Sequence, residues 1–220
     1  MDSIVLTGAS RGLGKALHDL ILTDYSAAQL ISISRSPVQT PNERATYLSA
    51  DFSHVPTLEF EIAEGVRRLV FINNAGSIEP IVTSMHLASD ELMMALMVNC
   101  IAPLSVARSL AEVAHVRGIT LLVLNVSSGA AKRPIPGWTA YCTSKASMAM
   151  ALDCLAAENP WVSVTHFDPG VIDTEMQARI RSSCPLDMPG VQNFIDLQKD
   201  NRLRSAADVA NDVLGMIRAL

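Results

Sequence analysis

Short runs of aliphatic residues recur along the chain, and longer stretches with a helical spacing of apolar positions separate them. The runs contain few polar residues, as expected of parallel β-strands that are covered on both faces. Six strands are predicted in this way: Ile4–Thr7, Leu30–Ser34, Thr46–Ala50, Leu69–Ile72, Thr120–Val126 and Val162–Phe167. The helical stretches are Leu13–Leu22, a short segment near Thr57–Glu64, Ser89–Val116 with a break near Pro103, and Tyr141–Glu158.

This alternation predicts an α/β protein with a Rossmann-type, doubly wound parallel sheet of six strands. No linker or repeat divides the chain, so we expect residues 1–220 to form a single domain. Ser36–Arg44 contains two prolines and lacks room for a full helix, which predicts an abbreviated crossover. Residues 174–204 follow the last strand and are expected to form a substrate lid, or alternatively a helical pair packed on the sheet edge.

The composition argues against nucleic acid and membranes as partners and leaves small molecules. The net charge is −5, so no basic surplus is available to bind nucleic acid or an anionic membrane. No apolar run approaches the ~20 residues that span a bilayer, and no signal peptide is recognisable. We therefore expect a cytoplasmic protein whose four cysteines are free thiols. Neither the cysteines nor the five histidines have metal-ligand spacing, and no metal site is expected.

A glycine-rich turn, Thr7-Gly8-Ala9-Ser10-Arg11-Gly12-Leu13-Gly14, follows the first predicted strand and opens the first helix. Glycine permits a positive φ and lets the backbone approach a ligand closely. The helix N-terminus then offers unpaired N–H groups to a pyrophosphate. The turn therefore predicts a dinucleotide site that includes Gly8, Ser10, Arg11, Gly12, Leu13 and Gly14.

The end of the second predicted strand indicates which dinucleotide binds. An NAD-preferring site normally has a carboxylate there for the ribose hydroxyls, but no Asp or Glu occurs between Asp24 and Glu43. Arg35 instead offers a planar donor group suited to a phosphate. Arg11, in the glycine turn, can approach the same phosphate from the other side. The two arginines and the missing acid favour NADP(H).

One tyrosine of the three in the chain, Tyr141, has a lysine four residues later, Lys145. Positions i and i+4 share one face of a helix, so the ammonium is expected near the phenol. A free phenol has a pKa of about 10, and a nearby cation is expected to lower it toward neutrality. Ser128 ends the fifth predicted strand, where its hydroxyl can hydrogen-bond a substrate carbonyl. The three residues predict proton transfer to that carbonyl.

Together these motifs resemble the compact short-chain dehydrogenase/reductases over nearly the whole chain. Besides the glycine turn, the matching stretches are Asp51, Asn73-Asn74-Ala75-Gly76, Asn99, Ser128, Tyr141-Cys142-Thr143-Ser144-Lys145 and Pro169-Gly170-Val171-Ile172-Asp173-Thr174. The resemblance implies hydride transfer between a nicotinamide and a ketone or alcohol. In that reaction Tyr141 is the general acid, Lys145 also binds the nicotinamide ribose, and Ser128 positions the carbonyl.

The resemblance also implies roles for the other matching residues. Asn99 holds a water in the proton relay, and Asp51 binds the adenine edge, with Phe52 also on the cofactor. The adenosine ribose packs beside Asn74, Ala75 and Gly76. The nicotinamide is lined by Pro169, Gly170, Val171 and Ile172, and Thr174 reaches its carboxamide or the pyrophosphate.

Within this family, Asp173-Thr174-Glu175-Met176-Gln177 and Leu197–Leu203 are similar to sepiapterin reductase and its benzil-reductase relatives. That similarity implies a diketone or a pterin side chain as substrate. The chain departs from the family by ending on a predicted helix, 206–220, without a seventh strand. It also lacks a counterpart to the C-terminal pterin contacts. We expect a homodimer through helices 103–116 and 141–157, and no tetramer of the common kind.

Two other functions share parts of this pattern. A sugar-nucleotide epimerase-like enzyme also uses a Tyr/Lys pair, but such enzymes have a larger substrate domain than this chain allows. A redox sensor can bind NADP(H) without turnover, but such a protein can lose the tyrosine. Retention of Tyr141, Lys145, Ser128 and Asn99 favours an enzyme over a sensor.

Overall fold

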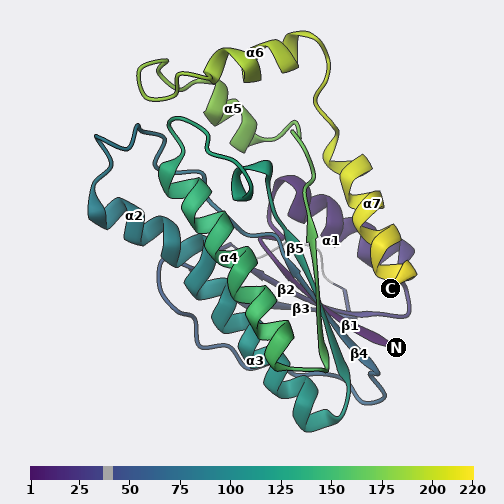
Figure 1. Cartoon of the computed structure of the whole chain (residues 1–220). Coiled ribbons are helices and arrows are strands. Elements are labelled where there is room, and N and C mark those ends of the chain that lie inside the picture. Colours follow the sequence, from purple (N-terminus) through teal and green to yellow (C-terminus); the bar gives the residue numbers. More distant parts are fainter. Residues whose placement is uncertain (37–41) are drawn as a thin grey trace.

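Six parallel strands form one sheet in the order β3-β2-β1-β4-β5-β6, in a computed structural model that describes residues 1–36 and 42–220 (Figure 1). The strands are β1 (Asp2–Thr7), β2 (Gln29–Ser34), β3 (Ala45–Ser49), β4 (Arg68–Asn73), β5 (Thr120–Val126) and β6 (Val162–Phe167). The strand order reverses between β1 and β4, and ligands of such sheets bind at the carboxyl ends of the strands beside that point. The predicted six-stranded Rossmann-type sheet is confirmed.

Helices cover both faces of the sheet (Figure 1). They are α1 (Gly12–Asp24), α2 (Ser89–Leu96), α3 (Ala102–Arg117), α4 (Thr139–Glu158), α5 (Glu175–Arg181), α6 (Val191–Lys199) and α7 (Ala206–Ala219). One hydrophobic core lies between the sheet and α1 with α7, and a second lies between the sheet and α3 with α4. The α5–α6 segment, residues 174–204, follows β6 and lies beyond the carboxyl ends of the strands (Figure 1).

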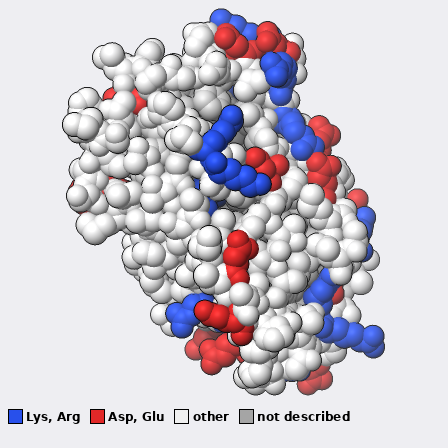
Figure 2. Space-filling view, in the orientation of Figure 1, with Lys and Arg blue, Asp and Glu red and all other residues white. Residues whose placement is uncertain are grey.

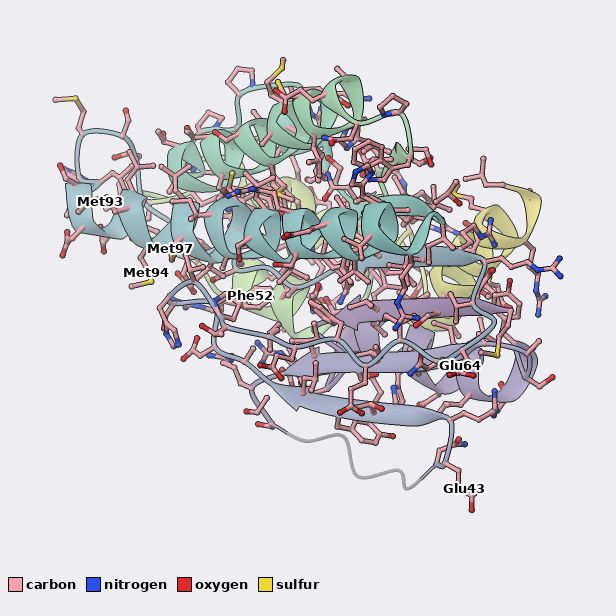
Figure 3. The ribbon with its side chains drawn as sticks, turned by 90° about the horizontal axis from the view of Figure 1, so that it is seen from below. Glu43, Phe52, Glu64, Met93, Met94 and Met97 are labelled. Atoms are coloured by element: carbon pink, nitrogen blue, oxygen red, sulfur yellow. The ribbon has the colours of Figure 1, made fainter. Side chains whose placement is uncertain are left out.

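The connection from β3 to β4 differs from the prediction. Thr57–Glu64, which was expected to be helical, is extended and runs between α3 and the sheet (Figure 3). Leu58, Phe60 and Ile62 turn toward the core while the residues between them are exposed, which is the period of two of an extended chain. The helical prediction is wrong because eight residues are too few to distinguish the 3.6-residue period of a helix from the two-residue period of an extended chain. The predicted abbreviated crossover, Ser36–Arg44, lies largely outside the described residues.

The long helical stretch also differs from the prediction in detail. Ser89–Arg117 is one continuous helix of 29 residues, and a π-helical turn, Met97–Ile101, takes the place of the expected break. Pro103 lies in the first turn of α3, directly after the π-helical turn, so the N–H that it lacks would have bonded to a carbonyl of that turn. By length and composition the helix would suffice to cross a membrane, a property that the core helices of soluble proteins share. Its buried residues pack against β4 and β5.

Candidate active site

The glycine turn holds the N-terminus of α1 close to the end of β1. Gly8 has a φ of +73° and Gly12 a φ of +55°, values that favour glycine. A Cβ on Gly14 would lie 2.0 Å from the Gly8 carbonyl oxygen, so the helix approaches the turn too closely for a side chain. In this fully described helix, α1 begins without a side-chain cap and without an acidic residue in its first turn. Its free N–H groups and positive dipole end therefore fit a pyrophosphate.

Hydrogen bonds tie the glycine turn to the segment after β4. The Thr7 hydroxyl accepts from the backbone N–H groups of Asn74 and Ala75, both at 3.0 Å, and Asn74 Nδ2 donates to the Thr7 carbonyl at 2.9 Å. The Asn74 side chain is thus used to hold the two loops together. A Cβ on Gly76 would lie 3.1 Å from Asn99 Oδ1 and 3.7 Å from Lys145 Nζ. This segment therefore joins the glycine turn to Asn99 and Lys145.

The residues predicted to bind the adenosine lie at the ends of β2 and β3. Arg35 follows β2 and is exposed. The N–H of Ser53, which donates to Asp51, lowers the pKa of that carboxyl, and the charge of Arg35 contributes to the same direction. The side chains of Phe52 and Leu13 are buried in the two cores, so only their backbone groups can face a cofactor.

Arg11 does not reach toward the end of β2 in this structure. Its guanidinium pairs with Glu175 of α5 at 3.0 Å, with both side chains exposed. Thr174 lies against the glycine turn as well, since its Cγ2 is 3.4 Å from the position of a Cβ on Gly12. The start of α5 thus packs on the glycine turn, and the Arg11–Glu175 ion pair links the two elements.

Tyr141 lies in the first turn of α4 and is only 7% exposed. Burial raises the pKa of Tyr141 to about 12, because a phenolate there would lose its hydration. A hydrogen bond with Ser128 acts in the opposite direction, and the charge of Asp168 adds to the increase. The sequence-based expectation that the pKa falls is therefore wrong for this structure.

Lys145 follows one turn later, on the same face as predicted, and is also 7% exposed. Its Nζ donates to the Val126 carbonyl at 3.0 Å and lies 5.8 Å from the centre of the Tyr141 ring. Burial lowers the pKa of Lys145 to about 8. A pKa of about 8 leaves most Lys145 side chains protonated at neutral pH, but burial dominates the pKa of Tyr141 all the same.

Asn99 connects the catalytic helix to the segment after β4. Its Oδ1 accepts from the Ser77 N–H at 2.8 Å, while its Nδ2 donates to the Ser77 carbonyl at 2.7 Å and to Ser144 Oγ at 3.0 Å. Ser144 Oγ in turn donates to the Tyr141 carbonyl at 2.9 Å. The π-helical turn that contains Asn99 directs this side chain into the site, a known use of such turns. Pro103 has no N–H to give the Asn99 carbonyl.

Ser77 and Ser144 were not assigned a role from the sequence. Ser144 lies inside the Tyr-to-Lys motif, but nothing in its spacing shows that it bonds to Asn99. Ser77 contributes only backbone groups to these two bonds, which a sequence pattern does not reveal.

An apolar wall flanks Tyr141 and was also missed. Trp138 packs between Tyr141 and Phe194 of α6, with ring centres 5.3 Å apart in both pairs. In the described part of the chain, Trp138 Nε1 is buried without a hydrogen-bond partner. The wall is completed by Ile78, Ile81, Ala130, Ile180, Met188 and Val191. These residues come from four separate segments, so no local spacing could have found them.

The segment after β6 lies next to the glycine turn. Gly170 has a φ of +70°, and its N–H donates to Asp168 Oδ1 at 3.0 Å. The turn continues through Ile172, which forms an isolated β-bridge with Arg204. This arrangement brings the predicted nicotinamide segment, Pro169–Thr174, to the same edge of the sheet as Tyr141. Among the described residues no group of three or more His, Cys, Asp or Glu side chains could hold a metal.

Comparison with known proteins agrees with this geometry. A family model described as short chain dehydrogenase matches residues 2–185. The chain is 30% identical to a benzil reductase ((S)-benzoin forming) of Bacillus cereus, over 99% of this chain and 94% of the relative. It is 31% identical to the sepiapterin reductase of Meriones unguiculatus, over 97% and 90%. The solved structure of the KRED1-Pglu enzyme superposes with a TM-score of 0.84 at 25% identity, over 98% and 94% of the two chains.

Proposed function

The chain belongs to the short-chain dehydrogenase family, and on that basis we propose that it is an NADP(H)-dependent carbonyl reductase with Tyr141 as general acid. Family membership makes it an oxidoreductase that acts on carbonyl or alcohol groups with a nicotinamide cofactor. The observation that supports the finer proposal is the meeting of Ser128, Tyr141 and Lys145 beside an uncapped helix N-terminus.

The proton chemistry follows from the burial of Tyr141. A nicotinamide cofactor, when bound, would supply the hydride for the carbonyl carbon. Tyr141, with a pKa raised to about 12, stays protonated at neutral pH and has a proton to give to the carbonyl oxygen. Ser128 hydrogen-bonds the phenol and can orient the same oxygen. Lys145 lies next to Gly76 and Tyr141, where its ammonium serves both a ribose hydroxyl and the phenol.

The apolar wall indicates a substrate with a bulky apolar group next to its carbonyl. Trp138 and Met188 are themselves buried, and Phe194, which is half-buried against Trp138, brings apolar surface to the edge of this cluster. Such surface stabilises a ligand through burial of apolar area and ring contacts. Relatives named for benzil and sepiapterin point the same way. We therefore propose ketones and vicinal diketones, including pterin side chains, as the substrate class.

The proposed preference for NADPH rests on Arg35. It is exposed at the end of β2, whereas Arg11 is already paired with Glu175. A charge-assisted hydrogen bond contributes roughly 1.5–3 kcal/mol, so NADPH should bind at least about tenfold more tightly than NADH. Arg35→Asp is expected to erase or reverse this preference, as measured by fluorescence titration with both cofactors. Equal affinity of the unchanged protein for the two cofactors would contradict the assignment.

A further inference from the structure

A region around Gly129, next to Ser128, is polar and open to solvent. Asp168 follows β6, Arg133 lies in the loop before α4, and both side chains are exposed. A Cβ on Gly129 would lie 3.5 Å from Asp168 Oδ2 and 3.6 Å from Arg133 Nε. A carboxylate and a guanidinium therefore border the space that the missing side chain leaves. Figure 2 shows that basic and acidic side chains lie side by side near the middle of this face of the molecule.

Neither the Asp168 carboxylate nor the Arg133 guanidinium forms an ion pair within the described residues, 1–36 and 42–220. Asp168 Oδ1 accepts from the Gly170 N–H at 3.0 Å, which fixes the carboxylate and leaves Oδ2 toward Gly129. The Cys142 thiol donates to the Arg133 carbonyl at 3.8 Å, which ties that loop to α4. The guanidinium N–H groups and one carboxylate oxygen are thus available to a ligand.

This space adjoins the catalytic groups. Gly129 directly follows Ser128, and the Ser128 hydroxyl also accepts from the Ala130 N–H at 3.2 Å. Burial is the main cause of the raised pKa of Tyr141, and the charge of Asp168 raises it further. Asp168 is therefore near enough to act electrostatically on the phenol. A substrate whose carbonyl meets Tyr141 and Ser128 would pass Gly129 on its way to solvent.

We propose that Asp168 and Arg133 form a subsite for a neutral polar group that carries an N–H donor beside a C=O acceptor. Carboxamides, ureides and cyclic amides have this pattern. The carboxylate accepts from the N–H and the guanidinium donates to the C=O. An anionic group is repelled by Asp168 and a cationic one by Arg133, whereas a neutral amide satisfies both. The subsite rests on the proposed carbonyl reductase function and adds a polar end to the apolar wall of Trp138.

A matched set of ketones tests the subsite. We would measure kcat/KM with NADPH for 3-acetylbenzamide, 3′-methylacetophenone and 3-acetylbenzoate. The unchanged protein is expected to prefer the amide over the methyl ketone by about tenfold or more, the size of one charge-assisted hydrogen bond. Asp168→Asn and Arg133→Gln should each lower that ratio, and the double variant should bring it close to one. Asp168→Asn should improve reduction of the benzoate, and Arg133→Gln should weaken it.

Lys132→Gln is the matched control, because Lys132 precedes Arg133 and is exposed like it. It should leave the amide preference intact. Equal kcat/KM for the amide and the methyl ketone in the unchanged protein would overturn the subsite while leaving the reductase proposal standing. An amide preference that persists undiminished in Asp168→Asn and in Arg133→Gln would also overturn the subsite. Failure to oxidise NADPH with any ketone, benzil included, would instead count against the proposed function.

Binding of benzamide tests the subsite without turnover. Benzamide carries the amide but no ketone, and saturation-transfer NMR can compare it with toluene in the NADP-loaded protein. We expect a stronger benzamide signal in the unchanged protein and in Lys132→Gln, and its loss in Asp168→Asn and Arg133→Gln. Equal signals for benzamide and toluene in the unchanged protein would overturn the subsite.

Discussion

Burial governs the acid–base chemistry of the two titratable side chains at the site. Tyr141 and Lys145 are equally inaccessible, and burial raises the pKa of the first to about 12 and lowers that of the second to about 8. Both shifts favour the neutral form, because a buried charge loses its hydration. Tyr141 therefore holds its proton at neutral pH, which is the state that carbonyl reduction requires, and Lys145 can exchange a proton near that pH.

Lys145→Met is predicted to change how stability depends on pH. The folded pKa of Lys145, about 8, lies below its ordinary value of 10.5, so the folded protein binds fewer protons than the unfolded chain between these values. The free energy of unfolding therefore rises with pH across this window, by up to about 3 kcal/mol. Methionine does not titrate, so the variant should lose this rise.

Urea unfolding of the two proteins without cofactor measures the difference. The comparison is best made between about pH 8 and pH 10, because Tyr141 begins to act in the opposite direction above its ordinary pKa of 10.0. A rise of equal size in both proteins would show that Lys145 is not its source.

At the scale of elements, the loop before α4 supports both the catalytic helix and the α5–α6 segment. Gly137 has a φ of +88°, and a Cβ there would lie 2.4 Å from the Asp187 carbonyl oxygen. The N–H of Val82 donates to the Gly137 carbonyl at 3.0 Å, which holds the loop in place. Trp138 follows directly and packs on Phe194. Close backbone approach at Gly137 is therefore what lets the α5–α6 segment cover Trp138.

Gly137→Ala is predicted to displace the α5–α6 segment, raise KM for ketones and expose residues 182–200 to proteolysis. Gly118→Ala is the matched control, because Gly118 also has a positive φ, +63°, but a Cβ there meets nothing within 4 Å. Both variants carry the backbone strain of alanine at positive φ, roughly 1 kcal/mol, but only the first overlaps another segment. Equal proteolysis of the two variants would argue against this role of Gly137.

The sequence was informative where one local pattern determines the structure. All six strands were predicted to within two residues, because aliphatic runs that are buried on both faces have few alternatives. Thr57–Glu64 failed because its alternating apolar residues are too few to reveal their period. The expected break at Pro103 is replaced by a π-helical turn, Met97–Ile101, because the helix accommodates the missing Pro103 N–H by widening one turn earlier.

The site was predictable in its motifs but not in its environment. The Tyr141–Lys145 spacing placed both groups on one helix face, as the structure has it. The direction of the Tyr141 pKa was missed, because burial depends on segments distant in sequence such as Phe194 and Met188. Asp168 and Arg133 were missed for the same reason, since they meet only where the ends of β5 and β6 come together.

At the scale of the whole molecule, exposed apolar side chains mark the long helices. Ile101 and Val116 of the Ser89–Arg117 helix and Met150 of α4 are 44%, 79% and 64% exposed. Large apolar side chains that lie exposed together on neighbouring helices often mark an interface. In the described sheet, β3 and β6 are the edge strands, and no strand pairs with the outer side of β6. We therefore propose a homodimer through helices 103–116 and 141–157.

Met150→Glu is predicted to convert this dimer to a monomer and to lower kcat, because α4 carries Tyr141 and Lys145. Sedimentation equilibrium measures the assembly, and Met85→Glu, at an exposed position outside both helices, is the control. A stable tetramer or a fully active monomer of the unchanged protein would contradict the proposed assembly.

Loss of the Tyr141 phenol tests the central claim most directly. Ketones, diketones and pterins would be offered with NADPH, and the best substrate compared between the unchanged protein and Tyr141→Phe. General acid catalysis contributes about 10²–10⁴-fold, so turnover should fall at least about a hundredfold while NADPH affinity stays nearly unchanged. Tyr25→Phe, at the end of α1 away from the glycine turn, should keep its activity. Near-normal turnover of Tyr141→Phe would contradict the account.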